Sequence, residues 1–234
     1  MSKNYISIIK KNLPKPLYNF LNKIYYKITD RNVYTDFNVR TIYMGHHNFT
    51  YRGIPTTKCP FDYALYQMII SEVKPDLIIE IGTLKGGSAL YLGDLLDILG
   101  FGIIHTIDIK KNYEKVLLKH PRIKLFTGGW ENYDLKETRG FKKILVIEDG
   151  AHTYECTMGA IKKFAPFVSI NSYLIVEDGI VDELGMKKKF NGGPVRAIHE
   201  FLKDNINYKI EKKWCDFFGK NATFNVDGYL RRIK

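Results

Sequence analysis

The chain has 234 residues, of which 45% are hydrophobic and 26% are charged. This length suits one doubly wound α/β domain with a sizeable core, and the composition excludes disordered, collagen-like and coiled-coil proteins. The sequence contains neither the roughly 20 consecutive apolar residues of a membrane span nor a signal peptide, so we expect a cytoplasmic protein.

Charge and cysteine content restrict which partners and which cysteine-based sites are expected. The formal net charge of +11 would suit nucleic acid, an anionic membrane surface or a phosphorylated substrate. Lysine is frequent along the whole chain, however, so we interpret the excess as a solvated surface and expect no nucleic-acid partner. Cys59, Cys156 and Cys215 are far apart and form no CxxC pair, which argues against a disulfide framework and a thiolate zinc site.

Residues 2–31 are basic, with seven Lys or Arg residues and one acidic residue. Apolar side chains recur there at helical spacing, namely Leu13, Leu17, Phe20, Leu21, Ile24 and Ile28. We therefore predict an amphipathic helical segment over residues 1–40. Such a helix could contact a membrane surface, but packing against the main domain or a second subunit is the more frequent outcome, and we expect a homo-oligomer.

Residues 41–60 are rich in Gly, Asn, His, Thr and Pro and show no sustained period, so we predict a long ordered loop, plausibly a lid. No role follows from the sequence for His46 and His47 in this loop.

Residues 61–234 alternate between apolar and amphipathic segments, a pattern typical of a parallel sheet with helices on both faces. We predict strands at 77–81, 102–108, 123–126, 143–149, 172–177, 208–211 and 222–226. Helices are predicted at 60–73, 88–99, 112–119, 153–164 and 194–204. The predicted fold is therefore a Rossmann-like domain with a mostly parallel seven-stranded sheet.

The first motif is LIIEIGTLKGGSAL, in which Glu80 is followed by Gly82, Gly86 and Gly87 before a helix that opens near Ser88. Glycines let the backbone approach a cofactor, and a helix N-terminus offers unpaired amides. The GxxxGG spacing differs from the GxGxxG of dinucleotide sites, which disfavours an NAD-dependent oxidoreductase. A tight turn without a ligand is the alternative.

The second motif is HTIDI, in which Asp108 ends the second strand about 25 residues after the glycines. From this position a carboxylate can accept hydrogen bonds from both ribose hydroxyls of an adenosine. Asp108 could instead cap the next helix. Together with the glycine turn, the position of Asp108 indicates nucleoside binding.

The third motif is a trio of acids, with Asp149 at the end of ILVIEDG and Glu177 and Asp178 at the end of SYLIVEDG. If the two strands are neighbours, these carboxylates meet at one edge of the sheet and repel one another unless a cation intervenes. Oxygen ligands suit Mg²⁺ or Mn²⁺ and not zinc. The alternative is that Asp149 caps the following helix and that the other two acids are solvated.

His152 lies three residues after Asp149, on the turn that leads into the next helix. An imidazole beside a cation can act as a general base, although a lone loop histidine is more often a surface residue. Asp149 is the competing candidate, because a carboxylate can bind the metal and also accept the proton.

The chain contains, in this order, YRGIP, KPDLIIEIGTLKGGSALYL, HTIDI, VIEDGAHTYE, SYLIVEDG and GGPVRAIHEFL. These linked motifs resemble the cephalosporin hydroxylase and rhamnosyl O-methyltransferase family over residues 51–202. The resemblance implies a class I methyltransferase fold that binds S-adenosylmethionine and a divalent cation. It also implies transfer of a methyl group to a hydroxyl of a sugar, in a polysaccharide, glycolipid or glycosylated natural product.

The resemblance assigns site residues as well. It implies that Glu80, Gly82, Ser88 and Asp108 line the cofactor pocket. We also expect cofactor contacts by Thr83, Gly86, Gly87, Gly129, Trp130 and Asp149. The implied metal ligands are Asp149, Glu177 and Asp178. His152 is similar in placement to the proposed base of metal-dependent macrolide-sugar methyltransferases, which share the DxxH spacing. The segment FTGGWEN departs from related methyltransferases, which often carry an acid or a serine after the glycine.

Three alternatives stay open. The acceptor could be a catechol-like small molecule, because catechols also offer two neighbouring hydroxyls to a metal ion. The chain could bind S-adenosylmethionine and metal without turnover. An RNA methyltransferase would exploit the positive charge, but the acid trio and the absence of an aromatic and basic RNA motif disfavour it.

Overall fold

The computed structural model describes residues 14–29 and 38–234, which belong to two compact units, Met1–Asn38 and Val39–Lys234. In the first unit, helix α2 (Lys15–Thr29) confirms the predicted helix over these residues, and the rest of the predicted segment up to residue 37 lies outside the described residues. Leu17, Phe20, Leu21 and Ile24 of α2 are exposed. Within residues 14–29 and 38–234, no helix is long and apolar enough to cross a membrane.

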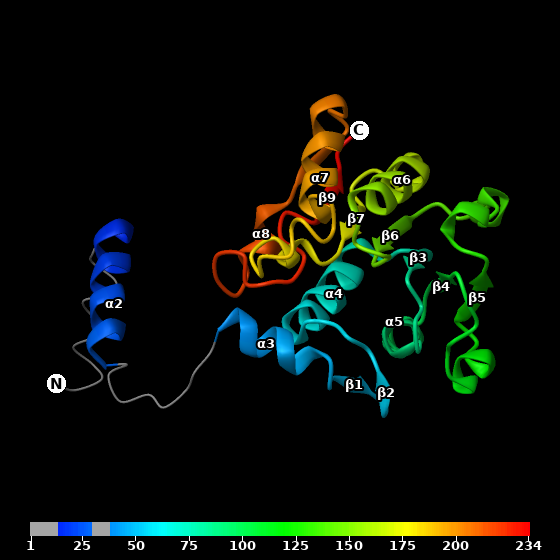
Figure 1. The fold of residues 1–234 in the computed structure, drawn as a ribbon, viewed down its shortest axis with the longest axis horizontal. Helices are drawn as coiled ribbons and strands as arrows, with labels where there is room; N and C mark the ends of the chain where they lie inside the picture. Colours follow the sequence, from blue (N-terminus) through cyan, green and yellow to red (C-terminus); the bar gives the residue numbers. More distant parts are fainter. Residues whose placement is uncertain (1–13, 30–37) are drawn as a thin grey trace. The chain divides into compact units, whose positions relative to one another are not determined.

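The second unit is built on a seven-stranded sheet with the order β5-β4-β3-β6-β7-β9-β8 (Figure 1). The strands are β3 (Leu77–Ile81), β4 (Ile103–Asp108), β5 (Ile123–Thr127), β6 (Ile144–Glu148), β7 (Tyr173–Val176), β8 (Tyr208–Ile210) and β9 (Tyr229–Arg232). Pairing is parallel from β5 to β7, and β9 runs antiparallel to both of its neighbours. The predicted mostly parallel sheet is confirmed.

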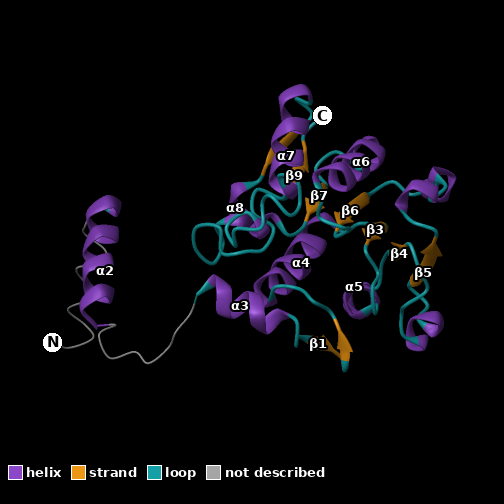
Figure 2. Ribbon diagram, viewed as in Figure 1, coloured by secondary structure: helices purple, strands orange, loops and turns teal. Residues whose placement is uncertain are grey.

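Helices cover both faces of this sheet (Figure 2). One face packs against α4 (Pro60–Val73), α5 (Gly87–Leu99) and α8 (Lys212–Cys215), and the other against α6 (Tyr154–Phe164) and α7 (Gly193–Asp204). Along β3, Ile78 belongs to the first core and Leu77 and Ile79 belong to the second. A strand buried on both faces reads as a continuous apolar run, which is why the sequence located these strands.

Short 3-10 helices complete the connections. They are η2 (Lys115–Lys119), η3 (Trp130–Asn132), η4 (Leu135–Thr138), η5 (Ala165–Phe167) and η6 (Gly179–Val181). The predicted helix over 112–119 is therefore wrong in type and length. His120 precedes Pro121 and is extended, as the residue before a proline usually is, so the helix ends at Lys119.

The predicted strand at 222–226 is also wrong, and the last strand is β9. Residues 223–226 alternate polar and apolar side chains, as a strand would. The backbone of Phe224, however, forms its hydrogen bonds with residues outside the sheet. The Phe224 amide donates to the Asp62 carboxylate, and the Phe224 carbonyl accepts from the Ile180 amide. This backbone is thus not available to a ladder.

The segment 41–60 is more regular than the predicted loop. It contains most of helix α3 (Val39–His46) and a hairpin of β1 (Thr50–Tyr51) and β2 (Ile54–Pro55). Ile42 and Tyr43 pack on a small core cluster with Cys59, Ile180 and Phe224, which explains why the helix forms without a strong sequence period.

Candidate active site

A cavity with a volume of about 450 Å³ opens at the carboxyl ends of β3, β4, β6 and β7. Ligands of open α/β sheets bind at this edge. One side of the cavity is formed by α3 and the residues after the hairpin, the second by the glycine turn and the loops after β4 and β5, and the third by the acids and the histidine after β6 and β7. The predicted site residues that line the cavity are Gly82, Thr83, Gly87, Ser88, Asp108, Gly129, Trp130, Asp149, His152 and Asp178.

Gly82 brings the glycine turn close to Asp149, on the acid side of the cavity. Its φ is +103°, and a Cβ atom on it would lie 2.0 Å from the backbone carbonyl oxygen of Asp149. The Asp149 amide in turn donates to the Ile81 carbonyl at 2.9 Å. Only glycine fits this position, because the neighbouring backbone occupies the space of a side chain.

Asp108 lines the cavity while also holding the turns around it. Its Oδ2 accepts from the Leu84 amide at 2.7 Å and its Oδ1 from the Lys110 amide at 3.2 Å. A carboxylate offers about four lone pairs, so capacity remains for the two hydroxyls of a ribose. The structural and the ligand-binding interpretation of Asp108 are therefore compatible.

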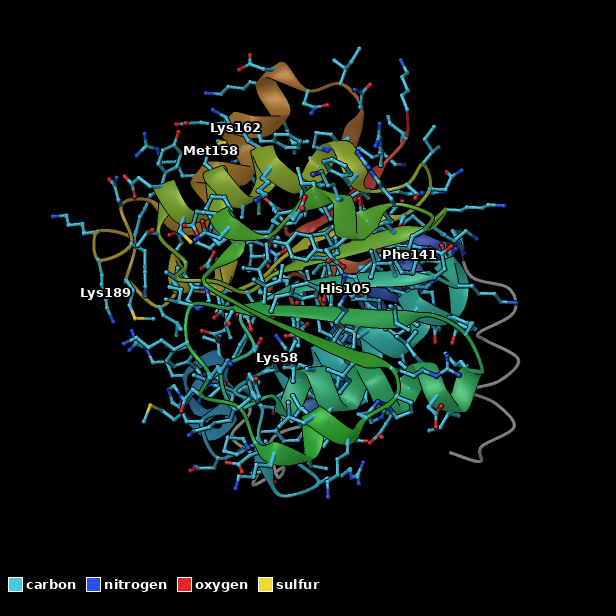
Figure 3. The ribbon with its side chains drawn as sticks, turned by 90° about the vertical axis from the view of Figure 1, so that its right-hand side faces the viewer. Lys58, His105, Phe141, Met158, Lys162 and Lys189 are labelled. Atoms are coloured by element: carbon cyan, nitrogen blue, oxygen red, sulfur yellow. The ribbon has the colours of Figure 1, made fainter. Side chains whose placement is uncertain are left out.

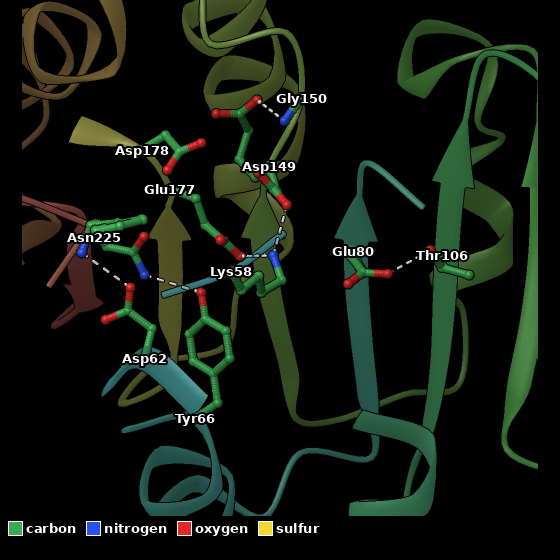
Figure 4. A network of polar contacts seen from close by, with 12 residues as sticks. Lys58, Asp62, Tyr66, Glu80, Thr106, Asp149, Gly150, Glu177, Asp178 and Asn225 are labelled. Carbon is green, nitrogen blue, oxygen red and sulfur yellow. Dashed lines mark hydrogen bonds and ion pairs between the residues drawn. The ribbon is translucent and has the colours of Figure 1, made fainter. Parts of the chain in front are cut away.

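Glu80 and Gly86 do not line the cavity, in contrast to the prediction. The Glu80 side chain is fully buried below the turn, and its Oε2 accepts from the Thr106 hydroxyl at 2.6 Å (Figure 4). Burial raises the pKa of Glu80, although Lys58 opposes the shift. A Cβ atom on Gly86 would lie 2.3 Å from the side chain of Leu117, so the lack of a side chain at Gly86 lets Leu117 pack against the turn.

Trp130 forms the wall of the cavity next to α6. A Cβ atom at Gly159 of α6 would lie 2.6 Å from the indole, so the indole rests directly on the bare helix backbone. The Lys163 ammonium, one turn further along α6, donates to the carbonyls of Trp130, Glu131 and Tyr133 at 2.7–2.9 Å. These contacts hold the FTGGWEN segment in place against α6.

The acids after β6 and β7 meet, and a lysine that the sequence analysis did not single out lies between two of them. The Lys58 ammonium is 2.7 Å from Asp149 Oδ2 and 2.6 Å from Glu177 Oε1 (Figure 4). Burial alone would lower the pKa of Lys58, but the two carboxylates hold it well above its usual value. Glu177 is buried and does not line the cavity, because its carboxylate turns to Lys58.

His152 and Asp178 form the cavity side of the acid group. His152 Nε2 lies 3.2 Å from Asp178 Oδ2, and both residues have positive φ values, 58° and 57°. Strained backbone of this kind is frequent at functional sites. Burial would lower the pKa of His152, but Asp178 and Asp149 raise it above its usual value. The neighbouring acids therefore favour the protonated form, opposite to the effect expected of a bound cation.

The arrangement fits a divalent cation. Asp149, His152 and Asp178 each offer one ligand atom, and these atoms lie within 4.8 Å of one another. Glu177 is not part of this group, so the structure divides the predicted acid trio between the cavity and Lys58. Two carboxylates facing one point suit a hard cation such as Mg²⁺.

Part of the cavity lining is aromatic. Tyr43 and His46 of α3, His47 directly after it and Phe190, which precedes α7, all line the cavity. The Tyr43 ring lies 5.8 Å from the Phe224 ring, which anchors α3 to the core. No role for these residues followed from the sequence, since only their shared place in the cavity lining distinguishes them.

Comparison with known proteins identifies relatives of this chain. The rhamnosyl O-methyltransferase of Mycobacterium tuberculosis (strain ATCC 25618 / H37Rv) is 29% identical over 192 residues, which cover 78% of each chain. The structure of CmcI-N160 with SAH has a TM-score of 0.64 at 20% identity and covers 88% of this chain and 91% of CmcI. The structure of CmcI-D160 with Mg and SAM has a TM-score of 0.61 at 22% identity and covers 88% and 84%.

These structures confirm the predicted Rossmann-like class I fold. The family model for rhamnosyl O-methyltransferase/CmcI matches residues 44–233, nearly all of the second unit. The resemblance carried by the motifs is thereby confirmed, and the chain belongs to the rhamnosyl O-methyltransferase/CmcI family.

Proposed function

We propose that this protein transfers a methyl group from S-adenosylmethionine to a hydroxyl of a sugar, with Mg²⁺ or Mn²⁺ bound at the cavity. The observation that carries the proposal is the single cavity in which the glycine turn, Asp108, and the group of Asp149, His152 and Asp178 meet. The M. tuberculosis relative, a rhamnosyl O-methyltransferase, and the CmcI structures with SAH or with Mg and SAM support it.

Seven residues of the cavity lining are proposed to bind the cofactor, and Asp149 lines the same cavity. They are Gly82, Thr83, Gly87, Ser88, Asp108, Gly129 and Trp130. The cofactor supplies a methyl group that a sulfonium already activates, so the chain has to hold it in line with the acceptor oxygen and exclude water. The backbone amides of the glycine turn and the Trp130 indole would fix its position.

Asp149 and Asp178 are proposed to hold the cation, and Glu177 would join them only by leaving Lys58. The ion would supply positive charge that acidifies an acceptor hydroxyl beside it. His152 is proposed to take the proton from that hydroxyl, with Asp178 orienting the ring through Nε2. The Nδ1 atom of His152 is buried and has no hydrogen-bond partner among the described residues.

The acceptor is proposed to bind next to the aromatic residues of the cavity lining. The faces of Tyr43 and Phe190 suit the apolar face of a sugar ring, and His46 and His47 offer hydrogen bonds to hydroxyls. We propose a rhamnose-like sugar of a polysaccharide, glycolipid or glycosylated natural product as the substrate class.

We further propose that the protein is cytoplasmic and homo-oligomeric, and that the basic α2 segment contacts an anionic membrane surface. The exposed side chains of Leu17, Phe20, Leu21 and Ile24, together with the lysines of the same helix, support the membrane contact. Sedimentation with phosphatidylglycerol vesicles, and its loss in a variant lacking residues 1–38, tests this point.

The central experiment measures methyl transfer to rhamnosyl acceptors with and without a chelator. Chelation is expected to abolish turnover and Mg²⁺ to restore it. Asp149→Asn keeps the side-chain shape but removes a charge, so it should lower the affinity for Mn²⁺ without unfolding the protein. Full activity in excess EDTA, or no binding of S-adenosylhomocysteine beyond that of adenosine, would contradict the proposal.

A further inference from the structure

Lys58 lies below the cavity, where it contacts two acids that follow neighbouring strands. Its ammonium bridges Asp149 and Glu177 at 2.7 and 2.6 Å, and its side chain is 1% exposed. Figure 3 labels it close to the carboxyl edge of the sheet. The proposed methyl transfer requires Asp149 but leaves Lys58 without a chemical step.

The backbone on both sides of Lys58 is fixed. Thr56 donates its amide and its hydroxyl to the Phe49 carbonyl at 3.1 and 3.2 Å. Helix α4 begins two residues after Lys58 with Pro60, whose ring restricts φ. The backbone next to Lys58 is therefore held by contacts that do not involve Asp149, and the ammonium is held by the two carboxylates themselves.

Asp149 is shared between two positions of positive charge. Its Oδ2 accepts from Lys58, and one of its oxygens also lies within 4.8 Å of the ligand atoms of His152 and Asp178. A divalent cation held by Asp149 and Asp178 would thus be separated from the buried Lys58 ammonium only by the Asp149 carboxylate. Two cations repel each other strongly at such a separation, because little water screens them.

We propose that Lys58 is a positioning residue that holds Asp149 and Glu177 in place and, through its charge, weakens the binding of a divalent cation beside them. Lys58 compensates Glu177 and leaves Asp149 and Asp178 as the carboxylates that face the cation. This inference rests on the metal site of the proposed function.

The test is the affinity of the full chain for Mn²⁺, followed by the electron paramagnetic resonance signal of free Mn²⁺ with S-adenosylhomocysteine present. Lys58→Met keeps the length of the side chain and removes its charge, so we expect about tenfold tighter Mn²⁺ binding. Lys58→Arg keeps the charge and should stay near the wild-type affinity. A purely structural role would give loss of affinity in both variants.

Two further variants keep the test decisive. Lys58→Met leaves the carboxylates of Asp149 and Glu177 without their cation, which destabilises the fold. The double variant Lys58→Met/Glu177→Gln removes both partners of one pair and should still bind Mn²⁺ about threefold more tightly than wild type. Lys213→Met removes a surface ion pair with Glu72 and is the matched control, expected to leave Mn²⁺ binding unchanged.

Tighter Mn²⁺ binding in Lys58→Met, or in the double variant where the single one does not fold, supports the inference. Equal or weaker binding by variants that still bind S-adenosylhomocysteine overturns it and leaves the metal site intact. A wild-type protein that binds S-adenosylhomocysteine but no Mn²⁺ would overturn both the inference and the proposed metal requirement, so the two failures can be told apart.

Discussion

Replacing His105 by glutamine should change how the stability of the protein depends on pH. His105 lies on β4 with 1% of its surface exposed, and its Nδ1 is 2.7 Å from the Tyr133 hydroxyl. Its ring also lies 5.8 Å from that of Phe141, which Figure 3 labels beside it. Burial, together with the charge of Lys124, lowers the pKa of His105 from 6.5 to about 4.

The magnitude follows from this shift. Between these two pKa values the unfolded chain binds a proton that the folded protein does not, so the free energy of unfolding falls as the pH falls. Each pH unit within the window corresponds to about 1.4 kcal/mol. Lowering the pH from about 7.5 to about 5 should therefore cost roughly 2 kcal/mol through His105 alone.

Urea unfolding followed by circular dichroism at both pH values measures this loss in wild type and in His105→Gln. All other titrating groups are common to the two proteins, so the variant should lose about 2 kcal/mol less than wild type. Tyr133→Phe is the control, because it removes the hydrogen bond but leaves His105 buried, and it should retain most of the pH dependence. Equal losses in wild type and His105→Gln would refute the reasoning.

Three further predictions concern the active site. Asp108→Ala should weaken the binding of S-adenosylmethionine by about 2 to 4 kcal/mol in calorimetric titration, because ribose hydroxyls would lose their partner; an unchanged affinity would contradict this role. Gly159→Ala should push the Trp130 indole out of place, since its Cβ would lie 2.6 Å from the ring, and we expect weaker cofactor binding and altered tryptophan fluorescence; wild-type values for both would show that the wall can adapt. His152→Ala should lower kcat by about 10²-fold to 10⁴-fold with little change in cofactor affinity; a kcat within a few-fold of wild type would transfer the base role to Asp149 or to water.

The parts of the fold that depend on local pattern could be predicted. The predicted bounds of β3 and α4 agree with the structure at every residue. β3 is apolar because it is buried on both faces, and α4 begins with a proline at its first turn, so both carry their own signals. The antiparallel end of the sheet carried a weaker signal, since the residues of β9 alternate no more clearly than residues 222–226.

The site could be predicted only in part, because its decisive contacts join distant segments. Lys58 is 91 residues from Asp149 and 119 from Glu177, and a single lysine before a helix shows no period or motif. Glu177 and Asp178 are adjacent in the sequence, yet one is buried against Lys58 and the other lines the cavity. The left-handed backbone of Asp178, with φ at 57°, separates them, and residue type alone does not predict it.

The position of β9 in the sheet affects the order in which the chain can fold. β9 follows β8 in the sequence but lies between β7 and β8, and it is the strand to which β8 pairs. During synthesis β8 therefore leaves the ribosome before its hydrogen-bonding partner exists, while the strands from β3 to β7 can already pair with one another. The edge of β7 stays open until residues 229–232 have emerged, and an exposed strand edge is a template for pairing with other chains. We expect nascent or truncated chains that end before residue 229 to aggregate through this edge.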